Sequence, residues 1–161
     1  MPLLFLLILM GDPIPMKVNV GDPVLDLPVT SLSNGAETSL KDLVSEGFCF
    51  FLAPNCGHCK TAMPNIKTYM RGKNTIYIFV GEKDEAAAFA KEHIGAQNNV
   101  FMVDTELLKP HSIVTFPAVI TYKDEKCRVA MHGPMKPKDL DLLLKLYSGA
   151  YTKKVLTQKK K

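Results

Sequence analysis

The chain has 161 residues, of which 47% are hydrophobic and 22% charged, the composition of an ordinary globular protein. This excludes a disordered or collagen-like chain, and the length suggests one domain that needs no disulfide staples. The net charge is +4, but five of the 20 basic residues are lysines within 153–161, where no acid lies. The rest of the chain has 15 basic and 16 acidic side chains and is nearly neutral. Its charge therefore does not indicate nucleic-acid binding.

An unbroken apolar run covers residues 3–10 and is followed by Gly11-Asp12-Pro13-Ile14-Pro15, which would end any helix. It is shorter than the roughly 18 residues of a membrane span, but it fits the hydrophobic region of a signal peptide or the end of a truncated anchor. No Lys or Arg precedes it and no clean cleavage site follows, so a docked apolar arm or a mis-chosen start codon stays open. We expect a signal- or anchor-like segment with a linker at 1–16, the domain at 17–150 and a solvated Lys-rich tail at 151–161.

The first half of the body alternates strand and helix patterns. The expected elements are a strand at 24–29, a turn at 33–35, a short strand and one helical turn at 37–44, a strand at 48–53 and a helix with Met63, Ile66 and Met70 on one face. The run at 48–53 is continuously apolar, which indicates a strand buried on both faces of a sheet.

The second half continues the alternation and ends in a hairpin and a helix. The expected elements are a strand at 75–80, a helix capped by Asp84 with Phe89, Ala90 and His93 buried and Gly95 at its end, a strand at 100–103, a hairpin of 118–122 with 127–131, and a helix that begins near Pro137. Leu140, Leu143, Leu144 and Tyr147 share one face of this last helix. The order predicts an α/β fold with a sheet of mixed direction.

The sequence Cys56-Gly57-His58-Cys59 lies between the apolar strand and the helix that follows it. This spacing lets two sulfurs meet across the first helical turn. Cys56 would lie at the helix N-terminus, where unpaired N–H groups and the helix dipole stabilise a thiolate. His58 would stabilise that thiolate further and favour the dithiol form, which makes the disulfide a better oxidant. Reversible redox chemistry by Cys56 and Cys59 is therefore the favoured hypothesis, and it needs no cofactor.

Three other uses are open to a cysteine pair of this spacing. A structural zinc site needs a second pair of ligands with similar spacing, and none is present, so no metal is expected there. A copper site made by Cys56, Cys59 and a distant histidine is the open alternative from another class, a copper-binding or metal-centre assembly factor. A static disulfide would close a very small loop and stabilise little.

Residues 50–60 with Met63-Pro64 resemble the active-site segment of thioredoxin-fold thiol–disulfide oxidoreductases, and are most similar to their TlpA/ResA-like branch. Further matches are Gly21-Asp22-Pro23 with Leu27-Pro28, the segment 39–43, Thr115-Phe116-Pro117 at the family's cis-proline position, and Gly133. The resemblance covers about residues 20–148. It implies a thioredoxin-like mixed central sheet flanked by helices, with an N-terminal β extension and one inserted strand–helix unit at 74–94.

The chain departs from the family pattern at three positions. Phe50 stands where thioredoxins have a buried acid, Ala62 where the TlpA/ResA-like branch has a glutamate, and Asn55 where a tryptophan is usual. The common proton acceptors for the buried thiol are therefore absent. The Gly57-His58 dipeptide is the one found in protein disulfide isomerase active sites.

The resemblance implies an enzyme that exchanges disulfides with protein substrates. Cys56 would attack a substrate disulfide and Cys59 would resolve the mixed disulfide, while Gly57 and His58 tune the thiolate. Pro54, Phe116 and Pro117 would form the docking groove for the substrate. A membrane thiol–disulfide carrier would be the redox partner, and the location would be outside the cytoplasm, secreted or anchored by the N-terminus. A cytoplasmic thioredoxin-like reductant is the alternative.

Cysteine and acidic residues elsewhere receive no functional prediction. Cys49 fits a small core residue, and Cys127 an unreactive hairpin thiol. The acidic cluster at 82–85 fits a solvated helix start.

Overall fold

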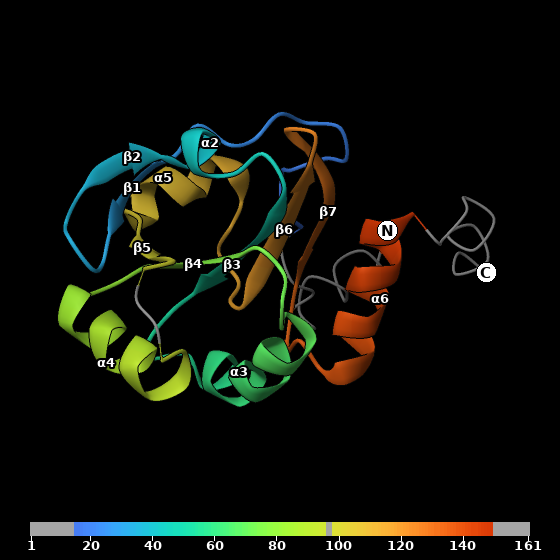
Figure 1. The fold of residues 1–161 in the computed structure, drawn as a ribbon. Coiled ribbons are helices and arrows are strands. Elements are labelled where there is room, and N and C mark those ends of the chain that lie inside the picture. Colours follow the sequence, from blue (N-terminus) through green and yellow to red (C-terminus); the bar gives the residue numbers. More distant parts are fainter. Residues whose placement is uncertain (1–14, 96–97, 150–161) are drawn as a thin grey trace, which may run out of the picture.

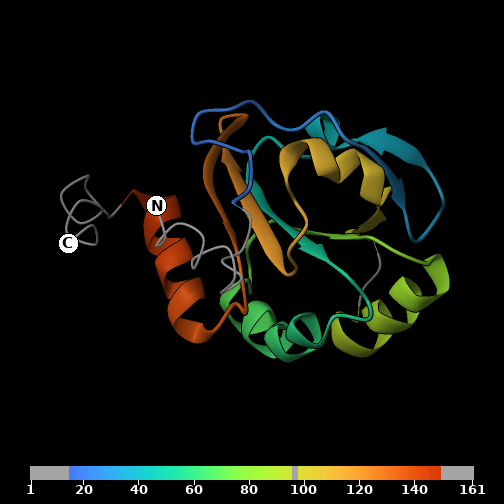
Figure 2. The ribbon, with the colours of Figure 1, turned by 180° about the vertical axis from the view of Figure 1, so that it is seen from behind.

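The computed structural model describes residues 15–95 and 98–149. A seven-stranded sheet in the order β2-β1-β5-β4-β3-β6-β7 forms its centre, with helices on both faces (Figures 1 and 2). The elements are β1 (Pro28–Ser31), β2 (Glu37–Ser39), α2 (Leu40–Leu43), β3 (Gly47–Leu52), α3 (Gly57–Tyr69), β4 (Thr75–Phe79), α4 (Lys83–His93), β5 (Val100–Met102), α5 (Thr105–Leu108), the 3-10 turn η1 (Lys109–His111), β6 (Ala118–Lys123), β7 (Lys126–His132) and α6 (Pro137–Ser148).

Strand β3 lies inside the sheet between β4 and β6, and all six of its residues are buried. It pairs in parallel with β4 and antiparallel with β6. Its side chains alternate between two apolar clusters, with Phe50 in the cluster on the α3 side and Phe51 in the cluster on the opposite face. Burial on both faces explains why the sequence of this strand is a continuous apolar run.

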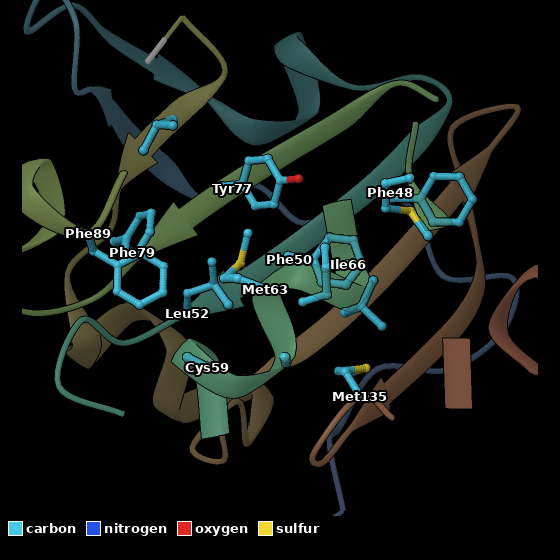
Figure 3. Close-up of a cluster of buried hydrophobic side chains, with 14 of the residues drawn as sticks. Phe48, Phe50, Leu52, Cys59, Met63, Ile66, Tyr77, Phe79, Phe89 and Met135 are labelled. Atoms are coloured by element: carbon cyan, nitrogen blue, oxygen red, sulfur yellow. The ribbon is translucent and has the colours of Figure 1, made fainter. Parts of the chain in front are cut away.

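Helices α3, α4 and α6 lie along one face of the sheet, while α2 and α5 lie along the other (Figure 1). The first cluster joins α3, α4 and α6 to the sheet through Met63, Phe89 and Leu143 (Figure 3). The second contains Leu40 of α2 and Leu108 of α5. The mixed sheet between two helical layers confirms the predicted fold class.

The strand predicted at 24–29 is misplaced, because the first strand is Pro28–Ser31. Before it, the backbone makes single contacts with several elements instead of one ladder. Val24 N–H donates to the carbonyl of Glu125, and the carbonyl of Leu27 accepts from Leu40 N–H. The alternating pattern of this segment reflects burial of Val24 and Leu27 without strand pairing.

Two details of the helices also differ from the sequence prediction. Helix α4 begins after Glu82, and no side chain caps it, so the prediction that Asp84 is the cap is wrong. Helix α5 was not predicted, because four residues are too few for a periodic pattern to appear. Asp104 caps α5 by accepting a hydrogen bond from Glu106 N–H at 2.9 Å.

The segments predicted as a signal- or anchor-like run and as a Lys-rich tail lie outside the described residues, apart from 15–16. Among the helices of the described ranges, none has the length and apolar character needed to cross a membrane.

Candidate active site

Cys56 and Cys59 lie together where β3 ends and α3 begins. After Leu52 the chain turns through Ala53, whose carbonyl accepts from Cys56 N–H at 3.1 Å. Cys56 is the N-cap of α3, and its sulfur accepts a hydrogen bond from Cys59 N–H at 3.3 Å. The sulfur of Cys56 thus takes the place of the oxygen of a capping side chain, at the end of the helix that favours negative charge.

The two cysteines have opposite exposures. Cys56 is half-buried, whereas Cys59 is 0% exposed and packs into the apolar cluster under α3 (Figure 3). Both are free thiols, as are Cys49 and Cys127. Of the four thiols, Cys56 alone is not fully buried.

Burial keeps the other thiols protonated. It raises the pKa of Cys59 far above its ordinary value, and the nearby Cys56 raises it further, while a backbone hydrogen bond from Ala53 lowers it in part. Burial alone raises the pKa of Cys49 to about 12. The pKa of Cys127 is raised to about 11, mainly by burial and also by the charge of Asp22. Neutral buried thiols are poor nucleophiles, because the thiolate is the reactive form.

Phe116 and Pro117 face the cysteine pair from the start of β6. The thiol of Cys56 donates a hydrogen bond to the carbonyl of Phe116 at 3.4 Å, although 60 residues separate the two. The Phe116–Pro117 peptide bond is cis. Gly133, just after β7, donates its N–H to the carbonyl of Pro117 at 3.0 Å.

The structure brings four of the predicted site residues together at this edge of the sheet: Cys56, Cys59, Phe116 and Pro117. Pro54 lies two residues before Cys56 and is buried. Gly57 and His58 lie in the first turn of α3 with their side-chain positions exposed to solvent. A Cβ at Gly57 would meet nothing within 4 Å, so available space alone does not require glycine there.

The three residues that depart from the family pattern lie in two different environments. Phe50 and Ala62 are buried in the same apolar cluster as Cys59. Asn55 is exposed, and its side-chain amide donates a hydrogen bond to a carboxylate oxygen of Glu85 on α4 at 3.0 Å. Glu85 thereby ties α4 to the loop before Cys56. The sequence prediction of a solvated helix start missed this contact, which only the tertiary structure creates.

Two of the grooves on the described surface bear on the site. One of about 200 Å³ adjoins the site and is lined by Pro54, Asn55, Lys60, Glu85, Ala88, Phe89, Glu92 and His93. A larger groove of about 510 Å³ lies between α2 and the β6–β7 turn and contains no cysteine. Within residues 15–95 and 98–149, no group of three or more His, Cys, Asp or Glu side chains could hold a metal ion.

The fold is similar to solved structures of thiol–disulfide oxidoreductases. A thiol:disulfide interchange protein from Bacteroides sp. is 18% identical, with a TM-score of 0.62 over 84% of this chain and 94% of that one. The thioredoxin domain of a thiol-disulfide oxidoreductase from Bacteroides vulgatus is 16% identical, with a TM-score of 0.58 over 78% and 98%. A secreted disulfide oxidoreductase of Mycobacterium tuberculosis, homologous to E. coli DsbE, is 16% identical, with a TM-score of 0.57 over 77% and 96%.

No family model matches the sequence, and no curated protein matches it significantly. The shared fold therefore rests on the arrangement of the elements, which extends over most of each compared chain. The sheet order, the cysteine pair at the end of β3 and the facing Pro117 lead to one conclusion: the chain has the thioredoxin-like fold of the thiol–disulfide oxidoreductases it resembles.

Proposed function

We propose that the chain is a thiol–disulfide oxidoreductase that exchanges disulfides with protein substrates through Cys56 and Cys59. The observation that carries the proposal is the contrast between the two thiols. Cys56 is half-buried at the N-terminus of α3, and the buried Cys59 lies one helical turn along, with its N–H bonded to the sulfur of Cys56. A reachable attacking sulfur beside a shielded second sulfur is the arrangement that two-step exchange requires.

In the reducing direction, the Cys56 thiolate attacks one sulfur of a substrate disulfide. A Cys56–substrate bond forms, and the other substrate sulfur leaves as a thiolate and takes up a proton. Cys59 then loses its proton and attacks Cys56, so that the Cys56–Cys59 disulfide forms and the reduced substrate leaves. In the oxidising direction the same steps run in reverse.

The loop at Phe116 and Pro117 would dock the substrate. The carbonyl of Phe116 accepts a hydrogen bond from the Cys56 thiol. Pro117 has no N–H, so it cannot form a competing hydrogen bond with the Cys56 sulfur. Backbone groups of this loop can pair with an extended segment of substrate, while Pro54 and Phe116 offer apolar walls. His58 is exposed in the first turn of α3, two residues after Cys56. An imidazolium at this position would stabilise the Cys56 thiolate and favour the oxidising role.

The proposed location is outside the cytoplasm, where a membrane thiol–disulfide carrier would supply or remove electrons. The apolar run at 3–10 supports export or attachment to a membrane, and one similar structure is that of a secreted oxidoreductase. A cytoplasmic reductant is the alternative. Residues 17–150 would form the working domain, with the N-terminal segment and the Lys-rich tail outside it.

Replacement of each cysteine in turn tests the proposal. We expect Cys56→Ser to abolish reduction of a protein disulfide, because the attacking sulfur is lost. Cys59→Ser should instead accumulate a covalent mixed disulfide with a single-cysteine substrate supplied as its disulfide with glutathione, because Cys56 displaces glutathione and no second thiol of the complex releases the substrate. Non-reducing electrophoresis and mass spectrometry measure both results, and Cys127→Ala, far from the site, serves as the matched control.

One result would contradict the assignment: continued turnover by Cys56→Ser, with no trapped species in Cys59→Ser. Titration of the reduced protein with Cu(I) separates the metal alternative. Stoichiometric copper binding that either substitution removes, together with no exchange in the parent chain, would identify the pair as metal ligands.

A further inference from the structure

The buried side of Cys59 consists of apolar atoms. Its neighbours in the cluster include Phe50 and Leu52 of β3, Met63 of α3 and Phe79 of β4 (Figure 3). Ala62, one turn along α3, lies on the same face of the helix. Each of these residues is at most 1% exposed, so bulk water does not reach the sulfur from this side.

No carboxylate is present in this cluster. The buried polar residues in the described parts of the chain are Ser31, Thr75 and Thr121, none of which is acidic. On β3 and α3 the cluster contains Phe50 and Ala62, which are apolar. Among the described residues, a proton that leaves the Cys59 sulfur therefore has no buried carboxylate to accept it.

The titratable residues that belong to this cluster or pack against it are Cys56 at the start of α3, Tyr77 in the cluster, and Tyr69 and Tyr147 at its margin. His58, which precedes Cys59 in α3, is exposed. Burial raises the pKa of Tyr77 to about 12, so its hydroxyl keeps its proton at neutral pH. Charged and titratable side chains of α3 and α4 line the outer groove beside Pro54 and Asn55: Lys60, Glu85, Glu92 and His93.

Attack by Cys59 requires its thiolate, because the thiol is a weak nucleophile. Burial is the largest cause of the raised pKa of Cys59, and burial does not depend on whether Cys56 carries a substrate. Attack by Cys56 does not face this obstacle, since its sulfur is half-exposed at the helix N-terminus. The site therefore favours attack by Cys56 on the substrate and impedes the later attack by Cys59 on the mixed disulfide.

We propose that Cys59 keeps its proton while a substrate is bound to Cys56, so that a second thiol of the substrate, rather than Cys59, releases the complex. The chain then rearranges disulfides in proteins with several cysteines more readily than it reduces them. This inference rests on the proposed function, because it concerns the fate of the same mixed disulfide.

The release step balances without an external oxidant. A second substrate thiol loses its proton to water and attacks the substrate sulfur bonded to Cys56. A new disulfide forms within the substrate, the bond to Cys56 breaks, and Cys56 leaves as a thiolate. The substrate keeps the same number of disulfides and the chain returns to its dithiol form, while Cys59 remains protonated throughout.

The first test uses the reduced full-length chain and oxidised glutathione, with acid quenching and mass spectrometry. The Cys56–glutathione adduct should accumulate at pH 7. Its conversion to the Cys56–Cys59 disulfide should accelerate about tenfold per pH unit from pH 6 to pH 9, because only the Cys59 thiolate attacks. Rapid conversion at pH 7, with a plateau below pH 8, would overturn the inference.

The second test introduces the missing acceptor. Ala62→Glu should speed conversion of the adduct at pH 7 by at least about tenfold and flatten its pH dependence, because a carboxylate beside Cys59 can take its proton. Ala62→Gln has the same size without the charge and should convert the adduct like the parent chain. Equal acceleration in both variants would contradict the proton-acceptor argument.

A third test uses a peptide with three cysteines and one disulfide as substrate, and measures directly how much of it is rearranged and how much is reduced. The parent chain at pH 7 should yield more rearranged than reduced peptide. The ratio should fall above about pH 8.5, where an ordinary substrate thiol is already ionised and only the fraction of ionised Cys59 still rises. An excess of reduced peptide at pH 7 would contradict isomerisation, even if Ala62→Glu does not fold. Failure to form any adduct at Cys56 would instead overturn the proposed function itself.

Discussion

Cys56 and Cys59 are three residues apart, yet their surroundings differ. Cys56 caps a helix and meets a carbonyl from β6, while Cys59 is surrounded by apolar side chains. The sequence was sufficient to predict this pair and its place before a helix. It could not predict the contact with Phe116, because 60 residues separate the two and only the fold brings them together.

Cys49 allows burial to be tested separately from catalysis. It is 0% exposed in β3, and burial raises its pKa to about 12, whereas a thiol in an unfolded chain ionises near about 8.5. Below pH 8.5 both states keep the proton. Between about pH 8.5 and 12 the unfolded state loses it first, so the free energy of unfolding falls by about 1.4 kcal/mol per pH unit for this thiol.

Cys49→Ala should therefore lose stability less steeply than the parent chain as the pH rises above 9. Urea unfolding at pH 8, 9 and 10, under reducing conditions, measures the difference. Ile76→Val, which truncates the residue paired with Cys49 on β4, is the matched control without a titrating group. Its curve should run parallel to that of the parent chain, and a parallel curve for Cys49→Ala would contradict the prediction.

Helix α3 is the element that positions both sulfurs, and its buried residues hold it on the sheet. Ile66 is 0% exposed, two turns beyond Cys59, and belongs to the same cluster. Ile66→Ala should lower the free energy of unfolding by about 2–5 kcal/mol, because the truncation leaves a cavity. Chemical denaturation measures this loss.

Lys67→Ala, on the exposed face of α3, is the control for that experiment and should change stability by less than about 0.5 kcal/mol. Similar losses in the two variants would mean that α3 is not held by this face.

The sequence predicts elements that have a long periodic pattern or apolar residues on both faces. It does not predict short elements or contacts that depend on the tertiary structure. Strand β3 was predicted because a central strand needs apolar residues on both faces, and α6 because Leu140 and Leu143 recur at helical spacing. The segment before β1 was misjudged, since Val24 and Leu27 are buried without a ladder. The Asn55–Glu85 contact requires α4 to approach the loop before Cys56, which local sequence does not encode.

At the scale of the whole molecule, strand direction explains the site. Strands β3 and β6 are antiparallel, with Phe51 opposite Ala118, so the end of β3 lies beside the start of β6. The residues that follow β3 and those that precede β6 therefore meet at one edge, and these are Cys56 and Pro117. The same arrangement leaves Cys49 and Cys127 in the cluster on the other face, apart from Cys56 and Cys59.

The most direct test of the central claim is redox equilibration of the full-length chain in glutathione buffers, from about −300 to about −150 mV, scored by thiol alkylation and mass spectrometry. The account predicts one reversible two-electron transition that joins Cys56 to Cys59, while Cys49 and Cys127 stay reduced. Absence of any transition of this pair across the range, in the folded protein, would contradict the account.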